Sequence, residues 1–138
     1  MEKEQKELMR QYKNILCKVL GGQLRMVRES SEIGPMGQFQ IEFFYEPTGL
    51  YITLDADRGV FTLDLADEAK DWNTLGRIKK FDNDMTEKCL ENAAVLLKQV
   101  LEENQFPLYK SENNKLYKKQ DGIYRRVKNI DAELAARE

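Results

Sequence analysis

A chain of 138 residues with 33% charged residues and a formal net charge of −2 has the size and composition of one globular domain. The sequence contains 0 histidines, which excludes Ser-His and Cys-His nucleophile pairs and histidine-ligated zinc or iron sites. We expect a single domain over residues 1–138 that lacks a membrane-spanning segment and a secretory leader, and we place it in the cytoplasm.

The N-terminal segment has the three-and-four spacing of an amphipathic helix. Its apolar residues share one helical face: Leu8, Tyr12, Ile15, Leu16, Val19 and Leu20. Gly21 and Gly22 follow, where a left-handed C-terminal cap favours glycine. We therefore predict a helix over residues 3–20.

Alternation of apolar and polar residues after this helix is typical of half-buried strands. The segments with this pattern or with β-rich composition are 23–29, 38–45, 50–54 and 61–65. Short turn sequences separate the last three, so we predict an antiparallel meander of about four strands. The turn before the last strand is predicted over Asp55–Gly59.

A second helix is predicted over residues 84–104, with Asp84 and Glu87 as a capping box. The Asp121-Gly122 pair lies between two short β-like runs and predicts a C-terminal hairpin. A short terminal helix is predicted over residues 130–138. This order of elements predicts an α+β fold in which the N-terminal and central helices cover one face of the sheet.

The acidic segment around Asp55 and Asp57 raises the possibility of a calcium loop. Counted from Asp55, the fifth, sixth and twelfth positions are Gly59, Val60 and Ala66, where an EF-hand needs an oxygen ligand, a glycine and a bidentate glutamate. A magnesium site would need an accompanying lysine or a glycine-rich phosphate loop, and neither follows these acids. The pattern therefore indicates a turn between strands, and a carboxylate-dependent hydrolase stays a minor alternative.

Charge is strongly segregated along the chain. Ten acidic and two basic residues lie between Glu29 and Asp71, whereas seven basic and two acidic residues lie between Leu108 and Lys128. The acids at the predicted turn and those after the next strand would lie at opposite ends of one hairpin, so a single acidic patch is a hypothesis. Charged residues that simply solvate the outer strand faces are the alternative.

The size, the helix-first α+β order and the charge character resemble those of bacterial immunity proteins, which neutralise a cognate toxin. The resemblance implies that an acidic surface docks against a basic cleft of a nuclease-like partner, with fast and salt-sensitive association. We expect a protein-binding inhibitor that is not an enzyme and holds no cofactor or metal. The expected partner-binding residues are Asp55, Asp57, Asp64, Asp67, Glu68, Asp71 and Trp72, with Tyr51 or Phe44 as alternative aromatic anchors.

A nucleic-acid-binding regulator or phage-encoded inhibitor is the alternative function. It would use the basic segment 108–128, in which aromatic residues alternate with cations that neutralise phosphates. The residues of this alternative basic site are Lys118, Lys119, Tyr124, Arg125 and Arg126. The sequence pI near 5.4 favours instead tyrosines that pack against the core and cations that stay solvated.

Overall fold

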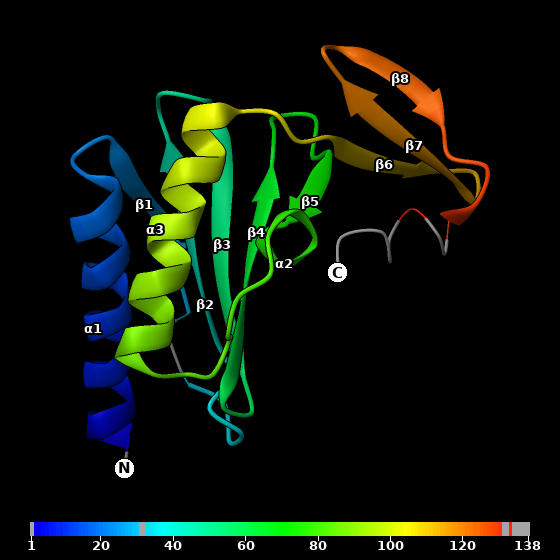
Figure 1. The fold of residues 1–138 in the computed structure, drawn as a ribbon. Helices are drawn as coiled ribbons and strands as arrows, with labels where there is room; N and C mark the ends of the chain where they lie inside the picture. The colour runs from blue at the N-terminus through cyan, green and yellow to red at the C-terminus, as the bar shows by residue number, and fades with distance from the viewer. Residues whose placement is uncertain (1, 31–32, 131–132, 134–138) are drawn as a thin grey trace.

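The computed structural model describes residues 2–30, 33–130 and 133. Within them the chain forms an α+β fold, as predicted, but the sheet has eight antiparallel strands in sequence order rather than about four (Figure 1). The described strands are β1 (Leu24–Glu29), β2 (Phe39–Tyr45), β3 (Leu50–Asp57), β4 (Val60–Ala66), β5 (Trp72–Thr74), β6 (Leu108–Glu112), β7 (Lys115–Gln120) and β8 (Ile123–Arg126). The described helices are α1 (Glu2–Leu20), α2 (Leu75–Ile78) and α3 (Glu87–Glu103).

Helix α1 ends as predicted, because Gly21 has a φ of 89° and its N–H donates to the carbonyl of Cys17 at 2.9 Å. The predicted capping box of α3 is wrong. Thr86 is the N-cap, and its hydroxyl accepts from the backbone N–H of Cys89 at 3.1 Å. Asp84 instead bridges to Val60 of β4, so the chain there is still extended.

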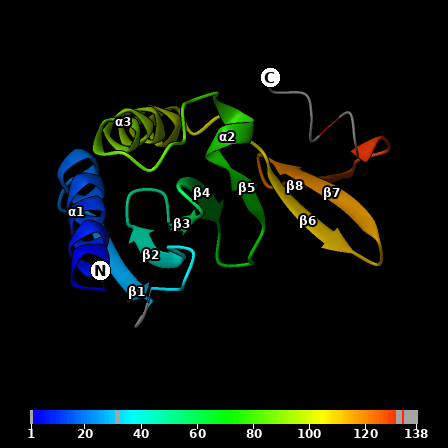
Figure 2. The same cartoon turned by 90° about the horizontal axis from the view of Figure 1, so that it is seen from below.

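The two long helices lie on the same side of the sheet (Figure 2), which confirms the predicted arrangement. Alternate residues of β2, β3 and β4 are buried there against one face of each helix. Tyr12 also donates its hydroxyl to the carbonyl of Met85 at 2.8 Å, which ties α1 to the start of α3. Each fully buried large apolar side chain stabilises the fold by about 1.5–3 kcal/mol.

The turn between β3 and β4 is shorter than predicted. Asp57 pairs with Val60, so the loop contains only Arg58 and Gly59, with φ values of 54° and 81°. A two-residue loop with positive φ at both positions matches the right-handed twist of the flanking strands. Consequently Asp55 and Asp57 lie within β3 rather than in the turn.

Strands β6, β7 and β8 project from the rest of the molecule (Figure 1), and we call them the wing. The remaining elements, α1 to α3 and β1 to β5, form the body. The predicted hairpin is confirmed, because Asp121 and Gly122 have positive φ and Gln120 pairs with Ile123. Within the described residues the sheet register joins wing to body through one residue pair, Trp72 with Tyr109.

Most of the predicted terminal helix, residues 130–138, lies outside the described residues. In the part of the chain that the structure describes, no helix combines the length and the apolar character needed to cross a membrane.

Candidate binding face

One face of the sheet in the body has no described helix packed against it (Figure 2), and we call it the open face. In β2 to β5 it consists of the residues that alternate with the buried ones: Gln40, Glu42, Phe44, Tyr51, Thr53, Asp55, Asp57, Val60, Thr62, Asp64, Ala66, Trp72 and Thr74. Strand β1 adds Arg25 and Arg28, the strand partners of Phe44 and Glu42. Because successive side chains of a strand point to opposite faces, the same alternation that builds the core also builds this surface.

A row of cross-strand partners crosses the open face and continues into the wing. From β2 to β6 its members are Phe44, Tyr51, Ala66, Trp72 and Tyr109. The ring centroids of Phe44 and Tyr51 are 5.0 Å apart, and those of Trp72 and Tyr109 are 5.6 Å apart. Both distances are within the range of favourable aromatic pairs. The row therefore holds two aromatic pairs that are separated by one small side chain.

Two arginines extend this aromatic row. The Arg25 guanidinium lies 5.4 Å from the ring centroid of Phe44, and that of Arg77 lies 5.1 Å from the centroid of Trp72. Both distances allow cation–π attraction, which holds each ring at a fixed place. Phe44, Tyr51 and Trp72 are only half-buried, so part of each ring faces solvent.

A groove of about 790 Å³ lies beside the small member of the row. It is lined by Arg28, Glu42, Tyr51, Ala66, Asp67, Glu68 and Lys70. Two of these lining residues, Arg28 and Glu42, form an ion pair at 3.7 Å. The groove therefore combines an aromatic side chain with charges of both signs.

Asp64 lies in the next row, between its strand partners Thr53 and Thr74. Burial raises the pKa of the Asp64 carboxyl to about 6, the negative charge of Asp55 adds to the increase, and Arg77 opposes it. The open face therefore gains negative charge as the pH rises through about 6.

Asp55 and Asp57 of β3, which were predicted in the turn, share this face. Asp55 accepts a hydrogen bond from the Gln40 amide at 3.1 Å. Asp57 ends the strand, with its carboxylate 3.6 Å from the Arg58 guanidinium. Together with Glu42, the three aspartates give the open face four carboxylates.

The other acidic residues that were predicted to bind a partner do not lie among these four carboxylates of the open face. Asp67, Glu68 and Asp71 lie in or beside the turn between β4 and β5. Only Glu68 of the three is exposed, and Asp71 is 1% exposed. The six predicted acids thus occupy two places, and the seventh predicted residue, Trp72, lies at the start of β5.

Asp67 and Asp71 contact the wing, an arrangement that we call the clasp. Lys119 donates to Asp67 and lies 2.8 Å from the carboxylate of Asp71, which also accepts from the hydroxyl of Tyr124. Burial alone would raise the pKa of Asp71, but hydrogen bonds from Lys119 and Tyr124 outweigh it and lower the pKa. The hydrogen bonds that Lys119 donates, first to Asp67 and then to Asp71, raise the pKa of Lys119. Acidic and basic segments therefore neutralise each other here.

The clasp also involves much of the alternative basic site. Lys110 and Lys119 lie 5.3 and 5.4 Å from the ring centroid of Tyr124, so this ring already has cation partners within the chain. Lys118 lies 3.2 Å from Glu133. Arg125 and Arg126 are exposed on β8.

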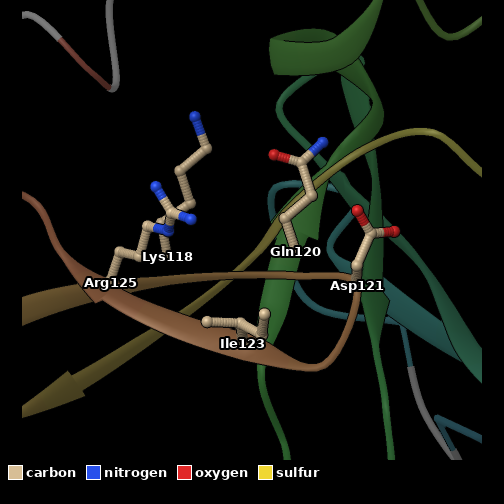
Figure 3. Close-up of a pocket in the computed structure, with 5 residues that line it drawn as sticks. All are labelled: Lys118, Gln120, Asp121, Ile123 and Arg125. Carbon is tan, nitrogen blue, oxygen red and sulfur yellow. The ribbon is translucent and has the colours of Figure 1, made fainter.

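A hollow of about 360 Å³ lies on the wing (Figure 3). It is lined by Lys118, Gln120, Asp121, Ile123 and Arg125. Its walls come from β7, β8 and the turn between them, so it is a surface feature of one hairpin.

Within the described residues, no three acidic or cysteine side chains lie close enough to hold a metal ion. The comparisons with known proteins found no matching family model, no matching curated protein and no matching solved structure.

The aromatic row was not predicted as a unit, although Phe44, Tyr51 and Trp72 were each predicted as possible anchors. The sequence does contain a signal for one pair in this row. The two-residue loop at Arg58-Gly59 sets the register of β3 and β4, and this register pairs Tyr51 with Ala66. No local signal predicts the pairing of Trp72 with Tyr109, because helix α3 separates their strands.

Proposed function

We propose that the protein is a small protein-binding module that docks the open face of its sheet onto a basic surface of another protein and thereby inhibits it. The observation that supports the proposal is the aromatic row beside four carboxylates on a sheet face that no described helix covers. The proposed partner is a toxin domain with a basic cleft, as for an immunity protein acting in the bacterial cytoplasm.

The two parts of the open face have different physical roles in this proposal. Aromatic side chains that are already held by neighbours lose little conformational freedom on binding, and they supply much of the binding energy of protein interfaces. Phe44, Tyr51 and Trp72 fit this role, since each has a ring or guanidinium partner.

The carboxylates would guide association instead. Complementary charge raises the association rate and suppresses wrong partners, and the effect weakens with salt. Glu42, Asp55, Asp57 and Asp64 are the residues for this role, because all four lie on the open face. Asp67 and Asp71 are left out, because the clasp already neutralises them.

The proposal is tested by affinity capture from the native host with the wild-type chain and two variants. Tyr51→Ala removes an anchor from the open face, and Lys115→Ala changes an exposed residue of the wing. We expect a captured protein that is lost with Tyr51→Ala and retained with Lys115→Ala. The purified pair should then associate more slowly as salt increases, and the captured protein should lose its activity in the complex.

Capture that is the same for all three chains, or that is lost only with Lys115→Ala, would contradict the proposal. Titration with single-stranded RNA and DNA at two salt concentrations tests the nucleic-acid alternative. Binding that weakens steeply with salt and depends on Arg125 and Arg126 would favour that alternative over the proposed function.

A further inference from the structure

Strand β8 is the last strand of the sheet, and no described strand pairs with its outer edge. All four of its residues are exposed, including Ile123 at 57% and Tyr124 at 43%. An edge strand presents unpaired backbone N–H and C=O groups, which can pair with an added strand. Its side chains then decide which segment can be added.

The two edges of the sheet differ in regularity. Strand β1, the other edge, has a register shift between Met26 and Arg28, an irregularity that discourages further pairing. Strand β8 pairs with β7 over four consecutive residues without a shift. The β8 edge is therefore the one whose geometry suits another antiparallel strand.

The clasp fixes β8 in place before any partner arrives. Tyr124 donates to Asp71 of the body, and its ring lies next to Lys110 and Lys119. A strand that is already ordered loses less conformational entropy on binding.

Strand β8 presents similar kinds of side chains on both faces of the sheet. Ile123 and Arg125 point to one face, where they line the hollow shown in Figure 3 with Lys118. Tyr124 and Arg126 point to the other face. Each face thus offers one large side chain, the aliphatic Ile123 or the aromatic Tyr124, followed by one arginine.

We infer that β8 accepts an extended acidic segment of a partner protein as a ninth antiparallel strand. In an antiparallel pair, the added segment would place two adjacent acidic residues opposite Arg126 and Arg125, followed by two apolar residues opposite Tyr124 and Ile123. A second copy of β8 fits poorly, because full antiparallel pairing would place Arg125 and Arg126 opposite Tyr124 and Ile123 of the other copy and would supply no carboxylate to either arginine. Arginines that only protect the edge from aggregation are the competing explanation.

This site is independent of the open face, so each proposal can fail alone. The probe is a capped peptide with two glutamates followed by two valines, flanked by serines. Two peptides serve as controls: one with lysines in place of the glutamates, and one with the same acidic sequence but N-methylated valines. The N-methyl groups remove backbone donors and leave the charge unchanged.

We expect the acidic peptide to slow hydrogen exchange at the amides of β8 and to shift their NMR signals. The double variant Arg125→Glu/Arg126→Glu should weaken this binding by about tenfold, because two attractive cross-strand pairs become repulsive. Lys128→Glu is the matched control, since it reverses a nearby exposed charge outside the strand, and it should have a much smaller effect.

Equal binding of the N-methylated peptide would overturn the inference, because it would show attraction between charges without strand pairing. Failure of the acidic peptide to bind the wild-type chain would overturn it as well. Because Arg125 and Arg126 are exposed, their substitution should leave the fold intact, and the peptide controls use the wild-type chain in any case.

Discussion

The body and the wing belong to one sheet but are held together by different forces. In the body, strands β1 to β4 and helices α1 and α3 share one continuous cluster of buried apolar side chains. Of the wing, only Leu108 belongs to that cluster. The wing is joined to the body by the clasp and by the pairing of Trp72 with Tyr109. Just before the wing, the Asn73 amide donates to the carbonyl of Pro107 at 2.7 Å.

This difference shows why the two regions should respond differently to change. Apolar burial is non-directional and shared among many residues, so the body should lose stability as a unit. The clasp depends on a few directional polar contacts, so its loss should open the wing locally.

The largest effect is expected from Phe43→Ala. Phe43 is 0% exposed in the middle of β2, and its truncation should leave a cavity that costs about 3–5 kcal/mol. Urea denaturation followed by circular dichroism measures the loss. Phe44→Ala is the matched control, because this neighbour faces the open side and its truncation creates no internal cavity. Equal losses for the two variants would contradict the assignment of the two faces.

The next largest effect is expected from Lys119→Met. This change keeps a side chain of similar length and removes the positive charge that Lys119 brings to the clasp. The carboxylate of Asp71, with its side chain 2% exposed, would lose its cation. We expect a cost of about 2 kcal/mol, below the range for fully buried pairs because Lys119 is partly exposed. Hydrogen exchange should become faster in residues 108–126 and stay nearly unchanged in β2 and β3.

Lys115→Met is the control for this variant, because Lys115 lies on the same strand and is exposed. A uniform change in hydrogen exchange over the whole chain would show that the wing is not a separate unit.

Lowering the pH gives a second test of the clasp. Since the pKa of Asp71 is lowered in the fold, its stabilisation is present above the ordinary value of 3.8 and is lost as the pH falls through the lowered value.

A smaller effect in the same place is expected from Tyr124→Phe. The change removes one hydroxyl donor to Asp71 and keeps both the ring and the contact of Asp71 with Lys119. Exchange in the wing should become faster than in the wild type but slower than in Lys119→Met. Tyr117→Phe, on the adjacent strand, is the control. If Tyr124→Phe opened the wing more than Lys119→Met, the charge of Lys119 would not be the main support of the clasp.

The smallest effect is expected in the body, from Asp64→Asn. The pKa of Asp64 is raised from 3.8 to about 6, so the folded state binds its proton more tightly than the unfolded state. Its penalty on stability is therefore absent below pH 3.8, grows as the pH rises, and is complete above about pH 6.

Asp64→Asn should accordingly raise the Tm by about 2–4 °C at pH 7 and leave it nearly unchanged below pH 4. Thermal unfolding at the two pH values measures this. Asp57→Asn controls for a general loss of negative charge, because Asp57 lies on the same face at the end of β3. A Tm increase of the same size at both pH values would show that burial of the charged carboxylate is not the cause.

Part of the candidate site follows from sequence periodicity alone. The alternation over residues 50–54 and 61–65 places Tyr51 and Asp64 on the open side of the sheet. Asp55 and Asp57 were predicted in the turn, and they join that face because β3 continues to Asp57. The fate of Asp67 and Asp71 does not follow from it. Asp67 contacts Lys119 across 52 residues of sequence, and Asp71 contacts Tyr124 across 53. No local pattern predicts which of several acids meets which of several bases.

The sequence by itself determined the two long helices, the β2–β4 meander and the β7–β8 hairpin, because each depends on hydrogen bonds and side-chain periodicity among near neighbours. Only the tertiary structure decided that one residue pair, Trp72 with Tyr109, joins the hairpin region to the meander in a single sheet. It also decided which charges remain exposed. The physical reason is that both outcomes depend on contacts between segments that are distant in sequence, and these segments meet only when α3 packs against α1 and the core side of the sheet.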